Sequence, residues 1–587
     1  MFIILMNEDS TTVDSITTDS LAAYGVPVII NLTNFPNRLL NKVFYTTREI
    51  SPTGYELDLA EVLSLTPFML DSYGQGQLNL VSQRGLDPNQ TKLFLNGHRF
   101  DNYLFGFFDL RKLPVQFIER MEIGENTTGI TSNTINLISK VNHYDKPYSY
   151  LNYTTGDWGT NIYNLDFTRP ITNDFGFYLS GLYWGYEGYR THSDVKINSF
   201  YTNFYYNQFI PMRLDIIYFS NDYGIHGNTL DTLYGRGNDK FLDVCYVNGF
   251  NNHKITLYYN LQQGNYADPF ASTLSTKNYG LNTESYLHTD NFEFIYGFAG
   301  SMSNIKTDLY GYHEVSSLNF WAKLNKSFSR CVSSISNHVE WLNTYNIFYE
   351  PKILLGLNIF DATYLIGSVS RSFRIPSICE TYEPRTIAYP YYGMNGNSDL
   401  QPEYYWIQEF GIKRENFILD FYKYDFTNHI INQFDTTGYY VPQNLSSWQT
   451  VGIENYLELP IAFTNPNDTT STTEISLGFA SNYLFKGDSL PFVPKGMVNF
   501  FLSLKRKSAR FTFALVAKQR TVSARQDISG QEMAPFSIFG LDGTIKFITL
   551  SCHLKIDNVF NRSYAIFSDY PMPPRSFTVS IKWEFWN

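Results

Sequence analysis

RSFTVSIKWEFWN, residues 575–587, alternates apolar and polar side chains over nine consecutive positions, from Phe577 to Phe585. Successive side chains of a β-strand point to opposite faces, so this segment would carry one wholly apolar face and one polar face. The apolar face needs an apolar neighbour, and the edge of the strand must be protected from pairing with other chains. The surrounding fold therefore has to supply both.

The composition of the whole chain also favours strands. Aromatic residues make up 17% of the 587 residues, and charged residues are likewise only 17%. Soluble domains usually carry about 25% charged residues. Tyr, Asn, Thr and Ser largely replace the missing charges, and Tyr and Thr in particular suit the pleated surface of a strand. These proportions predict an all-β protein.

Simple counts exclude several classes of protein. The longest apolar runs, such as MFIILM at the start, are well below the ~18 residues of a membrane-spanning helix. The net charge of −11 argues against a nucleic-acid partner. Cysteines and histidines are scattered, which indicates no metal site, no cofactor and no catalytic set, so we expect a protein that is not an enzyme. One long-range disulfide stays open, although buried free thiols are favoured, and His553 is interpreted as a wall residue.

The first ten residues, MFIILMNEDS, do not have the pattern of a signal peptide. They contain no Lys or Arg and only six apolar residues, whereas a secretory signal has a basic region followed by an apolar run of about 7–15 residues. Either the chain is cytosolic or its true start lies upstream of Met1.

The first quarter of the chain mixes helical and strand patterns. DLAEVLSLTP, from Asp58, places apolar residues at helical spacing and predicts a helix that Pro67 ends. Short strand patterns follow. Between two of them, the pair Asn96-Gly97 predicts a tight two-residue hairpin, because such a turn needs positive φ at both positions. We expect a compact α+β module here.

The rest of the chain contains only alternating segments, such as KITLYYNL (254–261) and FTFALVAK (511–518). Short turns such as PITND (170–174) alternate with longer polar stretches such as GYEGYRTHSD (185–194). Strands of about 10 residues, joined by short turns on one side and long loops on the other, are typical of outer-membrane barrels. A string of β-sandwich domains would also give short alternating strands, but neither a Pro/Gly/Ser linker nor a domain-sized repeat is found here.

The length of this part sets the size of the barrel. About 440 residues, at roughly 20 residues per strand and connection, correspond to about 22 strands. A barrel of that size has an open lumen, and known 22-stranded barrels are plugged. We predict an all-β fold, a large antiparallel transmembrane β-barrel of residues 144–587 with the N-terminal α+β module, residues 38–143, as a plug in its lumen. Residues 1–37 form an N-terminal segment.

Six motifs, in family order and at near-family spacing, resemble those of TonB-dependent receptors, and most closely those of the vitamin B12 (cobalamin) receptors within that family. Four lie in the plug: DLAEVLSLTP, GQGQLNLVSQRGLDPNQTKLFLNGHRF, DLRKLPVQFIERMEI and INLISK. Two lie in the barrel: SRSFRIPSICETYEP followed by GNSDLQPEYYWIQEFGIK, and KIDNVFNRSYAIFSDYPMPPRSF. The resemblance covers nearly the whole chain from about Val26.

This resemblance implies a receptor in the outer membrane of a Gram-negative (diderm) bacterium. Such a receptor binds a scarce, bulky nutrient, cobalamin or a ferric siderophore, at its extracellular face. The TonB–ExbB–ExbD complex of the inner membrane, driven by proton-motive force, then pulls an N-terminal TonB box and remodels the plug. Outer-membrane lipid and the barrel assembly machinery are further implied partners, and we expect a monomer.

The resemblance also assigns site residues. The ligand-binding plug apices correspond to Ser72, Tyr73, Gly74 and Gln75, and to residues 102–107, including Asn102, Tyr103 and Phe107. The aromatic residues among them either stack on a ligand or pack against the barrel wall. The residues expected to couple plug and barrel are Arg84, Gly85, Glu119, Arg120, Arg371 and Arg374, and the charged residues among them are expected to do so through ion pairs. A purely structural role is compatible with this, and Arg371 and Arg374 could instead face lumen water.

GVPVIINL (25–32) is the TonB-box candidate, with Val26, Pro27, Val28, Ile29 and Ile30 at its centre. Its uncharged, β-branched residues suit strand addition to a partner's sheet edge. The alternative is a first strand of the plug itself. One departure from the family lies at GENTTGITSNTINLISK (124–140), which lacks the family's Arg-Gly-Pro and Gly-Gly elements and is several residues shorter. That shortening puts coupling to TonB in doubt.

Two other functions remain open at this point: a passive porin whose plug has lost its energy link, and a surface receptor that transports nothing. In each case the closing strand has the same interpretation. Phe577, Val579, Ile581, Trp583 and Phe585 face lipid, and the polar residues between them face the lumen. Closure of the barrel pairs the strand with the first barrel strand.

Overall fold

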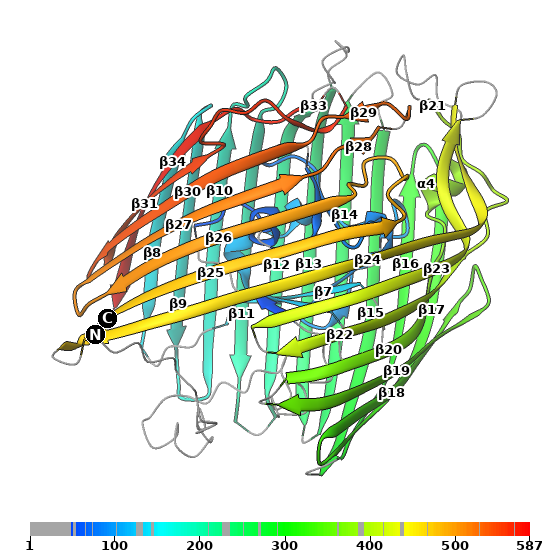
Figure 1. Ribbon diagram of the computed structural model, residues 1–587, viewed down its shortest axis with the longest axis horizontal. Helices are drawn as coiled ribbons and strands as arrows, with labels where there is room; N and C mark the ends of the chain where they lie inside the picture. Colours follow the sequence, from blue (N-terminus) through cyan, green and yellow to red (C-terminus); the bar gives the residue numbers. More distant parts are fainter. Residues whose placement is uncertain are drawn as a thin grey trace.

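The computed structural model shows a barrel of long strands around an N-terminal plug (Figure 1). It describes residues 48–50, 55–64, 66–72, 74–100, 102–124, 133–141, 146–208, 210–225, 235–250, 252–267, 272–289, 292–360, 363–384, 393–414, 416–434, 439–465, 468–527, 529–568 and 570–586. The TonB-box candidate (residues 26–30), Tyr73 and the predicted plug–barrel boundary at 143–144 lie outside these residues.

One closed sheet forms the barrel wall. Among the described residues it contains 22 strands longer than two residues, each antiparallel to its neighbours, which confirms the predicted barrel. The first two are β8 (Tyr148–Gly156) and β9 (Thr160–Pro170), and the last two are β31 (Leu550–Asp557) and β34 (Ser576–Trp586). The others are β10 (Phe175–Tyr186), β11 (Val195–Tyr206), β12 (Met212–Ile225), β13 (Gly235–Phe250), β14 (His253–Ala267), β15 (Ser272–Thr289), β16 (Phe292–Thr307), β17 (Gly311–Phe328), β18 (Cys331–Leu342), β19 (Ile347–Phe360), β20 (Thr363–Arg374), β22 (Glu403–Arg414), β23 (Phe417–Phe434), β24 (Tyr439–Asn465), β25 (Asp468–Lys486), β26 (Gly496–Lys507), β27 (Phe511–Val522) and β30 (Phe536–Phe547).

The closing strand β34 pairs with β31 on one side and with β8 on the other, which completes the barrel. Its side chains alternate as the sequence predicts. Ile581 is 49% exposed and Trp583 51%, whereas Thr578 and Ser580 are 5% and 3% exposed. The apolar face therefore points outward, away from the lumen, where a barrel of this kind meets lipid.

The two rims of the barrel differ. One carries short turns, such as residues 171–174 and 548–549, and the other carries long connections, such as residues 375–402 and 558–575. We refer to these as the turn rim and the loop rim. In outer-membrane barrels the long loops are extracellular, so the loop rim is the outer one. Short elements gather there (Figure 1): α4 (Ile378–Tyr382), β21 (Gly393–Met394), β28 (Arg525–Gln526), β29 (Glu532–Met533), β32 (Ala565–Phe567) and β33 (Tyr570–Pro571).

The plug, blue in Figure 1, lies in the barrel lumen and contains a five-stranded sheet of order β1-β6-β7-β4-β5. Leu59, Leu95, Phe117 and Leu137 are fully buried in its core. The elements are β1 (Arg48–Ile50), α3 (Leu59–Leu63), β2 (Met69–Ser72), β3 (Asn79–Ser82), β4 (Lys92–Leu95), β5 (His98–Arg99), β6 (Ile118–Gly124), β7 (Thr134–Ser139) and the 3-10 turns η1 (Pro88–Gln90), η2 (Leu110–Lys112) and η3 (Val115–Phe117).

The predicted helix is present but shorter than expected. It begins after the N-cap Asp58 and ends at Leu63 instead of continuing to Pro67. Ser64 donates to the carbonyl of Glu61 through both its backbone N–H and its hydroxyl, and Thr66 does the same to Leu63. These local bonds satisfy the carbonyls that a longer helix would use, so the helix stops after one turn.

The predicted hairpin is confirmed, because Asn96 and Gly97 have φ of 51° and 87° between the paired strands β4 and β5. No helix in the described part of the chain is long and apolar enough to cross a membrane. All four cysteines are free thiols. His553 is 5% exposed on the inner wall, where its ring stacks on Tyr55 of the plug at 4.3 Å.

Candidate ligand site and plug–barrel contacts

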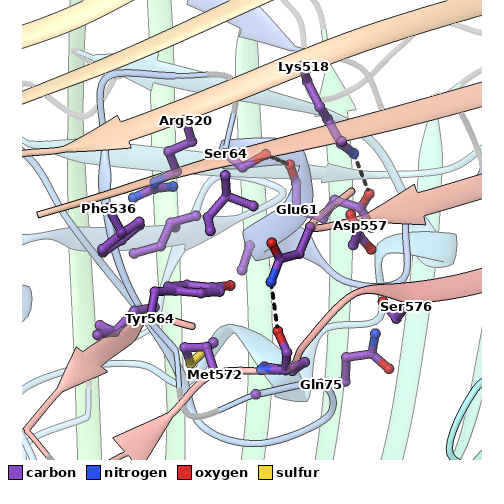
Figure 2. Close-up of a pocket in the computed structure, with 18 of the residues that line it drawn as sticks. Glu61, Ser64, Gln75, Lys518, Arg520, Phe536, Asp557, Tyr564, Met572 and Ser576 are labelled. Atoms are coloured by element: carbon purple, nitrogen blue, oxygen red, sulfur yellow. Dashed lines mark hydrogen bonds and ion pairs between the residues drawn. The ribbon is translucent and has the colours of Figure 1, made fainter. Parts of the chain in front are cut away.

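A cavity of about 250 Å³ lies between the plug and the barrel wall toward the loop rim (Figure 2). The plug contributes α3 and the first apex at Gly74 and Gln75, and the wall contributes β27, β30, β31 and the connection 558–575. Its apolar lining includes Phe536, Tyr564 and Met572. Its charged lining consists of Asp58, Glu61, Lys518, Arg520, Arg525, Lys555 and Asp557.

Glu61 of α3 joins the plug to the wall at one side of this cavity. Its Oε1 lies 3.0 Å from Lys518 Nζ and 2.8 Å from Lys555 Nζ. Lys518 also pairs with Asp542 at 3.0 Å, and Lys555 with Asp557 at 2.8 Å. We call these five residues the Glu61 node. Burial alone would raise the pKa of Glu61, but the attraction of Lys555 and Lys518 outweighs it and holds the pKa well below its usual value.

Asp58 lies beside Glu61, and within the described part of the chain it forms hydrogen bonds in place of such ion pairs. Its Oδ1 accepts from the backbone N–H of Glu61 at 2.9 Å, and its Oδ2 accepts from Asn79 Nδ2 at 3.1 Å. Burial raises the pKa of Asp58 to about 6, and these hydrogen bonds offset only part of the effect. The N-cap of α3 is therefore a carboxylate that the fold makes costly to ionise.

The first plug apex fits closely against the wall. Gly74 has φ of 120°, and a Cβ there would lie 3.3 Å from the ring of Tyr189. The Tyr189 hydroxyl donates to the carbonyl of Pro571 at 2.6 Å. Gln75 lines the cavity, whereas for Ser72 the structure describes only the strand backbone. Of the predicted first-apex residues, Gly74 and Gln75 are thus placed at the cavity.

The second plug apex is covered by α4. The backbone N–H groups of Ile378 and Cys379 donate to the carbonyls of Tyr103 and Leu104 at 2.9 and 3.0 Å. Tyr103 is 7% exposed and packs in an apolar cluster with wall residues of β16 to β20. Packing against the wall, one of the two alternatives for the apex aromatics, is the arrangement seen for Tyr103.

The other two predicted residues of the second apex lie at its turn. Asn102 Nδ2 donates to the carbonyl of Phe107 at 2.7 Å and closes the turn. Phe107 stacks on Phe105, with ring centroids 5.8 Å apart. Asn102 and Phe107 line a smaller cavity of about 80 Å³, which Ser377, the N-cap of α4, also lines.

Arg84 makes the densest contact between plug and wall. Its guanidinium lies 2.6 Å from Glu409, 2.6 Å from Asp420 and 3.2 Å from Glu454, on three neighbouring strands. Arg84 has φ of 58° and Gly85 has φ of 72°. A Cβ on Gly85 would lie 2.7 Å from Leu484, so the chain needs glycine there both for its conformation and for space.

The remaining predicted coupling residues are more dispersed. Arg120 pairs with Glu119 and Glu122 of its own strand, at 3.4 and 3.1 Å. Arg374 pairs with Glu380 at the start of α4 at 2.9 Å and with Glu403 at 3.9 Å, and Glu403 accepts a hydrogen bond from Gln90 of the plug. Through Glu403, Arg374 is thus linked to the plug.

Arg371 lies apart from these groups, with its guanidinium 4.7 Å over the ring of Tyr404. Its cross-strand neighbour is Trp406, which is 46% exposed. The structure therefore brings Arg84, Gly85 and Arg374 to the plug–wall interface, whereas Arg371 neighbours an exposed aromatic side chain.

Sequence reasoning missed the Glu61 node and α4. Glu61 lies within the plug motif DLAEVLSLTP and Lys555 begins the barrel motif KIDNVFNRSYAIFSDYPMPPRSF, but their spacing in the sequence does not indicate that they meet. The signal for α4 was readable, because Ser377 and Glu380 form the Ser-x-x-Glu pattern of a capping box, and both of its hydrogen bonds are present. Among the described residues, no three His, Cys, Asp or Glu side chains are grouped to hold a metal ion.

Comparisons with known proteins place the chain by family. Residues 123–559 match the model of the β-barrel of TonB dependent receptor-like proteins, and residues 44–134 match the model of the TonB-dependent receptor plug domain. No curated protein matches the sequence.

Several solved structures are similar in fold. The siderophore receptor PirA from Acinetobacter baumannii is 14% identical with a TM-score of 0.72, over 92% of this chain and 98% of that chain. A mutant ferric enterobactin receptor, PfeA, from Pseudomonas aeruginosa in complex with enterobactin is 13% identical with a TM-score of 0.69, over 93% and 100%. The copper transporter OprC is 14% identical with a TM-score of 0.73, over 92% and 99%.

Proposed function

Because the chain belongs to the family of TonB-dependent receptors, a family of outer-membrane receptors and transporters, we propose that it imports a metal-bearing nutrient with energy relayed by the TonB complex. The observation that carries this proposal is the cavity between the first plug apex and the wall near the loop rim. A ligand arriving from outside would contact plug and wall together there. Its binding could therefore change the contacts that hold the plug in the barrel.

The substrate class follows from two kinds of support. The solved structures of similar fold are named as receptors of siderophores and a transporter of copper, which supports a metal chelate. The motif resemblance supports cobalamin. We propose a ferric siderophore as the first candidate and cobalamin as the second.

The plug residues take their roles within this proposal. Arg84, Arg374 and the Glu61 node hold the plug against the wall at rest, and residues 26–30 engage TonB. A passive porin is the less favoured alternative, because the described plug residues bond to strands around the barrel, including β13 through Arg111, β18 through Arg99 and β27 through Glu61. A plug held in this way fills the lumen, whereas a passive porin needs an open path through it.

Uptake measurements test the proposal. Cells expressing the receptor are given radiolabelled ferric siderophores or radiolabelled cyanocobalamin, with and without a protonophore. We expect accumulation of one class that stops when the proton-motive force is collapsed and when residues 26–30 are deleted. Accumulation that survives both treatments would remove the energised mechanism and leave the passive one. A receptor that accumulates neither class, but whose plug-deleted form passes small solutes, would call for a different nutrient.

A further inference from the structure

We propose that an anionic arm of the ligand competes with Glu61 for Lys518 and Lys555, so that filling the cavity releases α3 from the barrel wall. This inference rests on the proposed uptake function and specifies two properties of it. The first is the chemistry of the part of the ligand that enters the cavity. The second is the contact through which the plug senses that the cavity is occupied.

The charges around the cavity are divided unevenly between plug and wall. The wall contributes four cations, Lys518, Arg520, Arg525 and Lys555, whereas its carboxylate in the lining is Asp557, and Asp542 pairs with Lys518 just beyond it. The plug contributes two carboxylates, Asp58 and Glu61, to the same lining. The wall side is therefore cationic and the plug side anionic, and each depends on the other for charge balance.

Glu61 is the carboxylate that bridges the two sides. It reaches both wall lysines within 3.0 Å, while its side chain is only 16% exposed. Without Glu61, Lys518 and Lys555 would keep Asp542 and Asp557 as partners, but the buried wall cations would outnumber the carboxylates around them, which is costly. A ligand anion at this position can take the place of Glu61 and restore that balance.

The cavity gives a ligand access to these lysines. Figure 2 shows Lys518, Glu61 and Asp557 on one side of the space and Phe536 and Tyr564 facing them from the other. An arm that combines an aromatic or otherwise apolar body with carboxylate, catecholate or phosphate oxygens would satisfy both sides. A volume of about 250 Å³ admits one such arm and not a whole chelate, because pockets for complete drug-sized ligands start at roughly 300 Å³.

The position of α3 gives this exchange a consequence. The helix follows β1 as the second described element of the chain, so it is close in sequence to the N-terminal segment that we propose engages TonB. It spans one turn, and Glu61 supplies its ion pairs to the wall. Replacing Glu61 by a ligand anion would therefore lower the resistance of this part of the plug to being drawn away.

Binding and hydrogen exchange on the full-length receptor in detergent test the inference. The anionic probe is the tris complex of Fe³⁺ with 2,3-dihydroxybenzoate, which presents catecholate and carboxylate oxygens. The cationic probe is ferrioxamine B, which carries the same metal. We expect the anionic probe to bind more tightly and to accelerate amide exchange in residues 59–64 at least fivefold. The cationic probe should leave the exchange of these amides unchanged.

Three substitutions sharpen the test. Glu61→Gln removes the competitor, so the anionic probe should bind about tenfold more tightly, and its addition should no longer change exchange in α3. Lys518→Met should weaken binding of the anionic probe about tenfold or more. Lys505→Met is the matched control. Lys505 lies near the turn rim on β26, away from the cavity, and pairs with Glu474 at 3.5 Å. The affinity of this variant for the anionic probe should equal that of the unmodified receptor.

Specific outcomes overturn the inference. Binding of the anionic probe without faster exchange in residues 59–64 of the unmodified receptor would refute the release of α3, whether or not the variants fold. Equal affinity of both probes would refute the anionic preference. Energised uptake of a nutrient that has no anionic arm would leave the proposed function standing and this inference refuted, whereas absence of any energised uptake would remove both.

Discussion

Among the described plug residues, Arg84 makes the most ion pairs to the wall, because its one guanidinium contacts three carboxylates on three strands. Replacing it by Met would leave Glu409, Asp420 and Glu454 close together and largely buried. Breaking a buried ion pair by removing one partner costs about 3–5 kcal/mol. We expect Arg84→Met to loosen the plug, seen as faster proteolysis of plug segments and as entry of large antibiotics into cells.

Arg506→Met serves as its control, since Arg506 is exposed at the turn-rim end of β26 and removal of its charge should leave both readouts unchanged. Unchanged proteolysis in Arg84→Met would mean that the three carboxylates relax by taking up protons or water, and that the contact is dispensable for holding the plug.

The raised pKa of Asp58 makes the stability of the folded plug depend on pH. Its pKa of about 6 lies above the value near 3.8 that it has when exposed, so the folded plug binds a proton more tightly than the unfolded chain. Stability associated with this group is therefore highest below about pH 4 and is lost as the pH rises through 6. The difference between the two pKa values corresponds to roughly 3 kcal/mol at most.

Asp58→Asn should remove this dependence while keeping the helix cap, because Asn caps helices as well as Asp. We expect the variant to be more stable than the unmodified receptor at pH 7.5, and the gap to close by pH 4, in calorimetric unfolding of the full-length protein. The ordinary loss of stability from Glu61 protonation at low pH acts on both proteins equally. A gap that is the same at both pH values would show that Asp58 is not the titrating group.

At this scale the sequence is informative where a motif exists. Arg84 and Gly85 could be assigned to plug–barrel contacts because they stand in a recognisable Arg-Gly motif, and both lie at that interface. Glu61 could not be paired with Lys518, because 457 positions separate them and their meeting depends on the registers of many intervening strands. The TonB-box candidate at residues 26–30 stays a prediction.

The contact between α4 and the second plug apex can be tested by a single substitution. The N–H of Ile378 donates to the Tyr103 carbonyl, and Ile378 is the first helical residue after the N-cap Ser377. Proline is tolerated at that position, and the extended backbone of Ser377, with ψ of 162°, suits a residue before proline. Ile378→Pro would thus delete this one link to the plug and keep the helix.

We expect Ile378→Pro to speed amide exchange in residues 104–107 by roughly two- to tenfold, since a net hydrogen bond contributes about 0.5–1.5 kcal/mol. Ile378→Ala is the matched control, because it removes the buried side chain and keeps the N–H. Equal exchange in the two variants would assign the hold on the second apex to apolar packing and not to the hydrogen bond.

Elements were predictable where one physical signal dominated. Alternation identified the barrel strands because each has one face toward lipid and one toward the lumen. The helix α3 is shorter than the apolar spacing predicted. Ser64 and Thr66 donate to its last carbonyls, and apolar spacing does not reveal this competition. The loop-rim elements such as α4 sit on plug or wall residues distant in sequence, so their placement needs the assembled molecule.

The barrel as a whole rests on the outward apolar face, which gives a prediction for the closing strand. Ile581 is 49% exposed on that face, opposite Tyr153 of β8 and Cys552 of β31. A basic residue on the lipid face near the bilayer midplane costs about 2–4 kcal/mol. We expect Ile581→Arg to lower the stability of the receptor in phospholipid vesicles by this amount in urea unfolding.

The neighbouring substitution Lys582→Arg keeps its charge and is expected to be neutral, because Lys582 points toward Tyr150 and Glu584 on the other face. Equal stability of Ile581→Arg and the unmodified receptor would mean that position 581 does not meet hydrocarbon. At this scale length and alternation sufficed to predict a barrel of about 22 strands, whereas the substrate was beyond them, since it depends on side chains gathered from separate strands and loops.

The pairing of β34 with β8, which completes the wall, affects how the barrel folds. Thr154 of β8 and Ser580 of β34 share a hydrogen bond of 2.7 Å across 426 positions of the chain. Contacts of such long range form slowly, because most of the chain's conformational freedom is lost before they contribute. The wall therefore stays open along this seam until its last strand is in place, and until then it offers a side entrance through which the plug can take its place.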